Sequence, residues 1–216
     1  MRNPLPRCRR LAGLAAAAAL GAALSIAPQP ARAQGPAADQ KTLRVVLIND
    51  LTAIDPVLSQ AAFVRNHGFF VYDQLFALDS KGQARPQMVD TYTVSPDGMR
   101  YSFTLREGLL FHDGQPVRAA DAVASVRRWA QRDIVGRALA ASTAAMEVVD
   151  DKTFTITLSR PFSLVLEALA RPTGSAIFVM PERVASTPAN VAITDPTGSG
   201  PFTFSTSEWR AGDRAI

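Results

Sequence analysis

His112 and Asp113 stand side by side in the stretch FHDGQP, with further carboxylates nearby at Glu107 and Asp121. A histidine and a carboxylate can form a small acid–base site when both side chains reach the same proton. Adjacent residues of an extended segment point to opposite faces, so His112 and Asp113 would point apart. The Asp-Gly pair favours a tight turn, and the proline that follows restrains the backbone. We therefore predict a strand end and a turn here, and no catalytic dyad.

Residue types for other chemistry are scarce. The two histidines, His67 and His112, do not form a pair at zinc-ligand spacing, and the single cysteine is Cys8. The sequence has no G-x-S-x-G elbow, and no lysine follows the glycines of GSGPF (198–202) as a phosphate loop requires. Carboxylates alone could still form a site. We expect no catalytic residue, no metal site and no cofactor.

Residues 1–33 have the pattern of a secretory signal. A basic start, MRNPLPRCRR, precedes the apolar run LAGLAAAAALGAALSIA, and Ala31 and Ala33 form an A-x-A cleavage site. We therefore expect cleavage after Ala33 and a periplasmic mature protein. An uncleaved membrane anchor is the alternative, although the apolar run is somewhat short for a membrane span. Arg9 and Arg10 leave both the general secretory and the twin-arginine export routes open.

Removal of this signal changes the charge of the chain. Five of the 23 Lys and Arg residues and none of the 19 Asp and Glu residues lie in residues 1–33, which leaves 18 basic and 19 acidic residues. The net charge of this remainder is −1, against +4 for the whole sequence. A basic surface for nucleic acid is therefore not expected. Without Cys8 the mature chain would also have no disulfide.

Hydrophobic patterns predict a chain of mixed helices and strands. LRVVLIN (43–49) has the continuous apolar character of a buried strand, and a helix is predicted from Pro56 to about Phe76. A turn is predicted at LDSKG (78–82). Two hairpins follow, one around SPDG (95–98) and one around the Asp-Asp-Lys turn in EVVDDKTFTITL (147–158).

Later segments predict further elements. Tyr101, Phe103 and Leu105 alternate with polar residues, which is typical of a half-buried strand. Residues 120–130 predict a helix with one apolar stripe and with Arg127-Arg128 on its solvated flank. The remaining predictions are a short apolar helix at 163–170, a polar connection at 181–190 and a strand at 198–204.

The stretch DGMRYSFTLREGLLFHDGQPVRAADAVASVRR (97–128) resembles the signature region of the family 5 extracellular solute-binding proteins, the peptide/nickel-type receptors of bacterial ABC importers. Its Asp-Gly turn, strand ending in Leu-Arg, His-Asp-Gly turn and Ala-x-Asp helix start occur in the family's order. Ala119 stands where members often have Ser or Thr as a helix cap, which implies a helix start weaker by about 1 kcal/mol. Further landmarks are Ile54-Asp55-Pro56, VYDQLFALDSKG (71–82), RPQMVDTY (85–92), FTITLSRPF (154–162) and GSGPFTF leading to Trp209.

The resemblance implies an α/β fold of the two-lobe periplasmic-binding-protein type, with only the first lobe and the accessory domain present. Residues 34–77 would begin the first lobe, residues 78–190 would form an accessory α+β domain, and residues 191–216 would return to the first lobe. Because family members are much longer, we expect this truncated chain not to function alone. Its broken sheet at 202–216 would leave apolar surface and an open strand edge.

The function implied by the resemblance is that of an extracytoplasmic receptor without catalytic activity. A monomer would bind oligopeptides or similar small solutes in a cleft and deliver them to ABC permease subunits in the inner membrane. A receptor for chelated nickel is one alternative. A secreted enzyme that uses a carboxylate site is another, of a different class.

Candidate ligand-binding residues lie in two segments. The loop after the first strand and the start of the next helix should face the cleft, although a solvated helix face is the alternative for each residue. These candidates are Thr52, Ser59, Gln60, Arg65, Asn66 and His67. Arg171 follows an apolar helix in a Leu-x-Arg-Pro sequence that resembles a cleft-lining segment of the family. Its guanidinium can hold a ligand carboxylate by two parallel hydrogen bonds, or it can satisfy carbonyls at the helix end.

Overall fold

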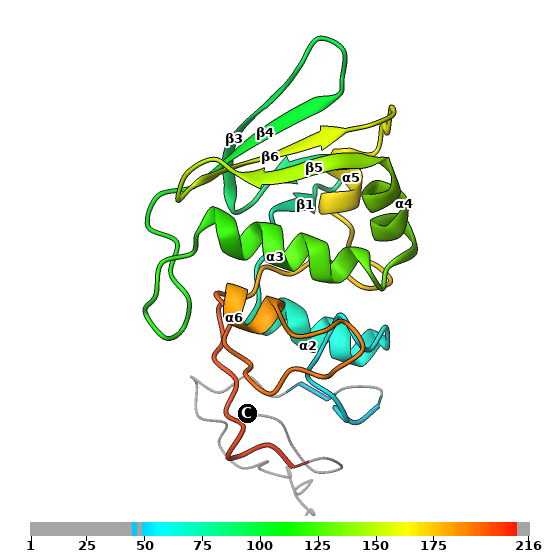
Figure 1. The fold of residues 1–216 in the computed structure, drawn as a ribbon. Coiled ribbons are helices and arrows are strands. Elements are labelled where there is room, and N and C mark those ends of the chain that lie inside the picture. The colour runs from blue at the N-terminus through cyan, green and yellow to red at the C-terminus, as the bar shows by residue number, and fades with distance from the viewer. Residues whose placement is uncertain (1–44, 47–48, 211–216) are drawn as a thin grey trace, which may run out of the picture. The chain divides into compact units, whose positions relative to one another are not determined.

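The computed structural model describes residues 45–46 and 49–210 of the 216-residue chain. The predicted signal, residues 1–33, lies outside the described residues. The described helices and strands, in chain order, are α2 (Ala62–Val71), β1 (Phe76–Leu78), β2 (Ala84–Pro86), β3 (Val89–Val94), β4 (Arg100–Leu105), α3 (Ala119–Ala130), α4 (Ile134–Ser142), β5 (Thr143–Val148), β6 (Thr153–Leu158), α5 (Val165–Leu169) and α6 (Glu182–Ala185) (Figure 1). The mixed α and β class predicted from the sequence is confirmed.

Four antiparallel strands form the larger sheet, in the order β3-β4-β6-β5 (Figure 1). Both predicted hairpins are present, since β3 pairs with β4 and β5 pairs with β6. Gly98 closes the first hairpin with a φ of 69°, a left-handed conformation that glycine adopts without steric strain. In β4, Tyr101, Phe103 and Leu105 are buried and alternate with less buried residues, as predicted.

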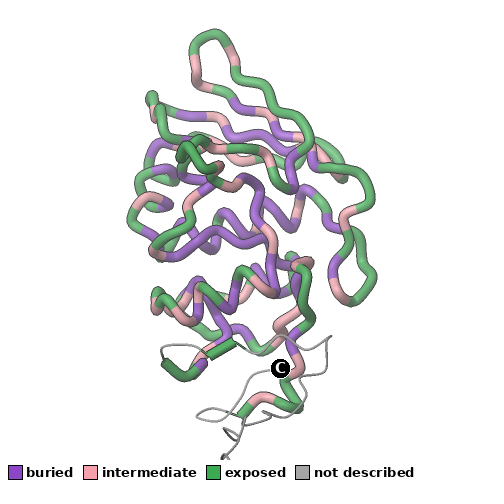
Figure 2. The backbone as a smooth tube through the Cα atoms, turned by 180° about the vertical axis from the view of Figure 1, so that it is seen from behind, coloured by how far each residue is buried: buried purple, intermediate pink, exposed green. Residues whose placement is uncertain are grey.

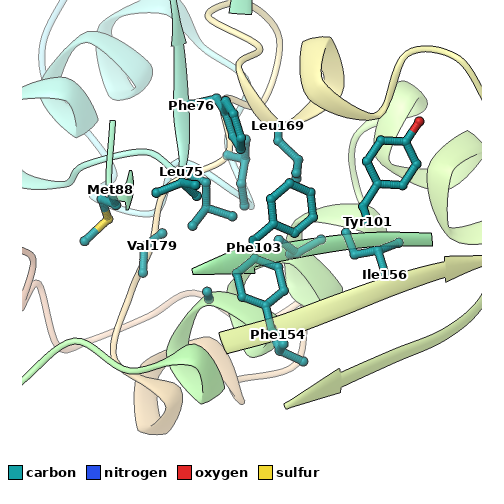
Figure 3. Close-up of a cluster of buried hydrophobic side chains, with 14 of the residues drawn as sticks. Leu75, Phe76, Met88, Tyr101, Phe103, Phe154, Ile156, Leu169 and Val179 are labelled. Carbon is teal, nitrogen blue, oxygen red and sulfur yellow. The ribbon is translucent and has the colours of Figure 1, made fainter. Parts of the chain in front are cut away.

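The main core lies between this sheet and the helices that cover one of its faces. The rings of Phe103 and Phe154 stack with centroids 5.0 Å apart, and Leu169 belongs to the same cluster (Figure 3). Trp129 of α3 is fully buried there, and its indole N–H donates to the backbone oxygen of Ser175 at 2.5 Å. Large aromatic side chains bury much apolar area each, so they anchor α3 to the sheet.

A second buried cluster surrounds α2. Val64 and Val71 of this helix pack with Phe178 and with Leu51 of the preceding loop. Gly68 allows the close approach, because a Cβ atom at this position would lie 2.7 Å from the ring of Phe178. Figure 2 shows how buried, intermediate and exposed residues are distributed along the backbone.

The GSGPF segment packs against the end of α2. The backbone N–H groups of Gly200 and Phe202 donate to the backbone oxygens of Val71 and Phe70, at 2.9 and 3.0 Å. A Cβ atom at Gly198 would lie 1.9 Å from the oxygen of Val71, so a side chain there would require the backbone to move. The strand predicted for this segment is wrong, because its backbone bonds go to a helix end instead of a neighbouring strand.

The strand predicted at 43–49 is absent at its described positions. Val45, Val46 and Asn49 have no strand conformation, and Val46 is 96% exposed. A run of apolar residues indicates a preference for burial, but a strand also needs a partner for its backbone groups. No described strand pairs with these three residues. The rest of the run lies outside the described residues.

The helices also differ from prediction. Helix α2 begins at Ala62 because Pro56–Leu58 form a turn, and it ends at Val71, well before Phe76 enters β1. Two described helices, α4 and α6, were not predicted, and α6 lies inside the segment expected to be a polar connection. Helix α5 is shorter than predicted. Short helices supply too few turns for a clear periodic signal.

Candidate functional site

A buried ion pair anchors the loop that precedes α2. Nη1 and Nη2 of Arg128 donate to the two carboxylate oxygens of Asp55, at 3.1 and 2.7 Å. The two side chains are only 2% and 1% exposed. The prediction that Arg128 lies on a solvated flank of its helix is wrong, because the Asp55 loop and the segment 187–193 cover that flank.

The surroundings of Asp55 favour its charged form. Burial by itself raises the pKa of this carboxyl group, but the hydrogen bonds and positive charge of Arg128 outweigh it. The backbone N–H groups of Leu58 and Ile193 lower the pKa further, so it lies below its usual range. Asp55 of the Ile-Asp-Pro landmark is therefore a charged structural group, poorly suited to donate or accept protons near neutral pH.

Six of the candidate ligand residues lie on this loop and on α2, and five of them are at least partly exposed. Thr52 and Gln60 are exposed, and the hydroxyl of the half-buried Ser59 accepts a backbone N–H at the start of α2, at 3.4 Å. On the helix, Arg65 is half-buried and Asn66 is exposed. Apart from Ser59, none of these side chains has a hydrogen bond or ion pair with another described residue. The loop thus presents polar groups that its described neighbours leave unused.

His67 is the most enclosed of the candidates. It is 8% exposed, and its ring meets that of Phe204 edge to face with centroids 4.8 Å apart. Within the described residues neither ring nitrogen has a hydrogen-bond partner. Burial lowers the pKa of the imidazole to about 4, so the ring is neutral at pH 7.

Arg171 has contacts of its own, none of them with the other candidates. Its Nε donates to the backbone oxygen of Thr173 at 3.0 Å and lies 3.5 Å from a carboxylate oxygen of Asp133. Asp133 is itself fixed, because it accepts the N–H groups of Val135 and Gly136 at the start of α4. The Arg171 side chain is 27% exposed. Its other N–H groups have no described partner, so the guanidinium could hold a carboxylate on its free edge.

The His112–Asp113 pair is structural, as predicted. Nε2 of His112 lies 2.8 Å from the backbone oxygen of Gly200 and donates to it, whereas Asp113 pairs with Arg183 at 2.8 Å. The two side chains thus serve different partners and share no proton. Glu107 pairs with an exposed lysine elsewhere.

A hollow of about 400 Å³ lies between α3, α4 and β5, and none of the candidate residues lines it. Its walls are largely apolar and include Val126, Leu139 and Met146. In the described part of the chain, no cluster of three or more His, Cys, Asp or Glu side chains could hold a metal ion. No described helix is long and apolar enough to span a membrane.

Landmarks that are far apart in the sequence are thus in contact in the structure. The His-Asp-Gly turn forms hydrogen bonds with the GSGPF segment, and this segment packs on the end of α2. The family model of bacterial extracellular solute-binding proteins, family 5 (middle part), matches residues 83–216. The chain belongs to this family. The resemblance inferred from the sequence is confirmed.

Individual family relatives agree with this assignment. A probable peptide ABC transporter periplasmic-binding protein of Sinorhizobium fredii is 44% identical over 193 residues, which are 89% of this chain and 35% of the relative. The glutathione-binding protein of Salmonella typhi is 32% identical over 191 residues, 88% of this chain and 36% of the relative. The solved periplasmic binding protein AgaA of A. tumefaciens R10, in complex with agropinic acid, has a TM-score of 0.60 and 29% identity, over 74% of this chain and 32% of that chain. The present chain thus spans about a third of the length of these relatives.

Proposed function

We propose that the full-length protein is an extracytoplasmic receptor that binds a peptide or a similar small solute and delivers it unchanged to an ABC importer. The observation that carries this proposal is the 44% identity to a protein named as a peptide ABC transporter periplasmic-binding protein. A glutathione-binding relative supports a peptide-like ligand. The receptor acts as a monomer in the periplasm after cleavage behind Ala33, and its partners are permease subunits in the inner membrane.

The ligand meets the polar loop before α2 and the first turns of that helix. Hydrogen-bonding groups there come from Thr52, Ser59, Gln60, Arg65, Asn66 and His67. Arg171 takes a carboxylate of the ligand by parallel hydrogen bonds. The ligand named for AgaA is an acid, which supports recognition of a carboxylate.

Identification of a co-purified ligand tests the proposal most directly. The full-length protein is purified from its source without denaturation, and any retained molecule is identified by mass spectrometry. Calorimetry with tri-alanine and reduced glutathione then measures binding, and chromatography of the recovered compound tests whether it is unchanged. A peptide-like molecule released intact is expected. Retained nickel with an organic chelator would favour the nickel alternative, and conversion of the bound compound would favour an enzyme.

A further inference from the structure

Arg128 connects two separate segments of the chain, the Asp55 loop and residues 187–193, to α3. Besides its two bonds to Asp55, its Nε donates to the backbone oxygen of Thr187 at 2.9 Å and its Nη2 to that of Val191 at 3.0 Å. The side chain is almost fully buried at this junction. A planar guanidinium suits the position because its donors are fixed in a fork and remain charged.

Asp55 binds further backbone groups at the same buried junction. Its Oδ1 accepts the backbone N–H groups of Val57 and Leu58 at 3.0 and 3.2 Å, and its Oδ2 accepts that of Ile193 at 3.1 Å. The backbone from Leu51 to Gln60 forms only a turn, with no helix or strand to order it. The ion pair with Arg128 is therefore a main tertiary restraint on this loop.

We propose that Arg128 is a positioning residue of the receptor: through Asp55 it sets the loop that carries Thr52, Ser59 and Gln60. This inference rests on the proposed function, because it assigns the ligand contacts to that loop. A purely structural pair would stabilise the whole fold without altering how the folded protein binds. A positioning pair also holds the loop in the binding geometry, so weakening it lowers affinity even when the protein is folded.

The experiment compares two conservative variants of the full-length protein with a matched control. Arg128→Lys keeps the charge but loses the fork, and Asp55→Asn keeps the shape but loses the charge. Arg127→Lys is the control, because the neighbouring arginine is exposed and its side-chain bond goes to Met146 in β5. Should one variant fail to fold, the other remains informative.

Hydrogen exchange provides the first readout. In Arg128→Lys and Asp55→Asn, exchange of the Val57, Leu58 and Ile193 amides should become at least about tenfold faster, since these groups donate to Asp55. Exchange at Phe103 and Phe154, in paired strands of the core, should accelerate less than exchange at the loop amides. Unchanged exchange at all three loop amides would overturn the inference, as would an equal acceleration at both core amides.

Calorimetric titration of tri-alanine and reduced glutathione provides the second readout, well below the unfolding temperature of each variant. Affinity for whichever probe the unchanged protein binds should fall at least about tenfold in both variants and stay the same in Arg127→Lys. Equal affinity in a folded variant with a loosened loop would overturn the inference. If the unchanged protein binds neither peptide probe, the peptide proposal loses its support, and hydrogen exchange alone decides whether Arg128 positions the loop.

Discussion

At the scale of single residues, Arg127 and Arg128 show how far neighbours on one helix can differ. Arg127 is exposed and donates to the backbone oxygen of Met146 at 2.6 Å. Arg128, one position further along the helix, enters a buried junction with Asp55. Successive helical residues point about 100° apart, so the two side chains meet different surroundings.

The buried ion pair should dominate the stability of this junction. Arg128→Met is expected to lower the free energy of unfolding of the full-length protein by about 3–5 kcal/mol, because it leaves Asp55 buried without a counter-charge. Arg127→Met should change it by about 0.5 kcal/mol or less. Urea unfolding followed by circular dichroism measures both values. Equal effects of the two substitutions would contradict the assignment of Arg128 to the buried junction.

His67 should make stability depend on pH between its two pKa values. In the unfolded chain the imidazole binds a proton below its ordinary pKa of 6.5, whereas in the folded protein it does so only near pH 4. The contribution of His67 to the free energy of unfolding is therefore fully present above pH 6.5. About 3 kcal/mol of this free energy is lost as the pH falls to about 4. Urea unfolding between pH 4 and 6.5 should show that the free energy of unfolding falls as the pH falls, and His67→Phe should reduce this slope. A slope that survives the substitution would belong to other groups.

Arg171 allows a test that separates binding from stability. Arg171→Lys should weaken a carboxylate-bearing ligand by about 1–3 kcal/mol, because lysine cannot form two parallel hydrogen bonds. The melting temperature without ligand should change little, since a lysine can still reach Asp133. Arg85→Lys is the control, as Arg85 also pairs with an aspartate but is 60% exposed. Equal losses of stability with and without ligand would instead assign Arg171 a structural role.

At the scale of elements, the start of α3 depends on Asp121. Its Oδ2 accepts the N–H of Arg118, the N-cap residue, at 2.7 Å, and its Oδ1 accepts the N–H of Glu182 at 2.6 Å, which joins α3 to α6. Ala119 is the first helical residue and is fully buried, so the cap lies one position earlier than predicted.

Substitutions at Asp121 and Ala119 should therefore have different effects on the free energy of unfolding. Asp121→Ala is expected to lower the free energy of unfolding by about 1–2 kcal/mol, because two backbone donors lose their acceptor. Ala119→Ser, which would restore the residue type frequent in the family, should bring no gain, because position 119 cannot serve as the cap. Thermal unfolding of both variants checks this. Stabilisation by Ala119→Ser would show that the cap lies at 119 after all.

At the scale of the whole molecule, the chain spans about a third of the length of its relatives. A closed receptor site encloses most of its ligand. We therefore expect residues 34–216 alone to bind tri-alanine or glutathione at least about tenfold more weakly than the full-length protein does. Parallel calorimetric titrations of the two proteins test this, and equal affinities would show that residues 34–216 contain a complete site.

The sequence by itself determined the features that depend on neighbouring residues. Turn residues at SPDG and alternation along β4 predicted the first hairpin, because a turn and a strand face are set within a few positions. The His-Asp-Gly turn was interpreted correctly for the same reason. The family could also be inferred, since its landmarks occur in order along the chain.

Only the tertiary structure decided which side chains meet across long separations. Asp55 and Arg128 lie 73 positions apart, and nothing near either residue indicates the other. The GSGPF segment has a strand-like pattern, yet its glycines let it pack on the carbonyl end of α2. Periodicity shows which residues favour burial or solvent, but partners for a charge or a backbone group are supplied by distant segments. The physical reason is that burial of polar groups requires satisfied bonds, and those bonds exist only after the chain has folded.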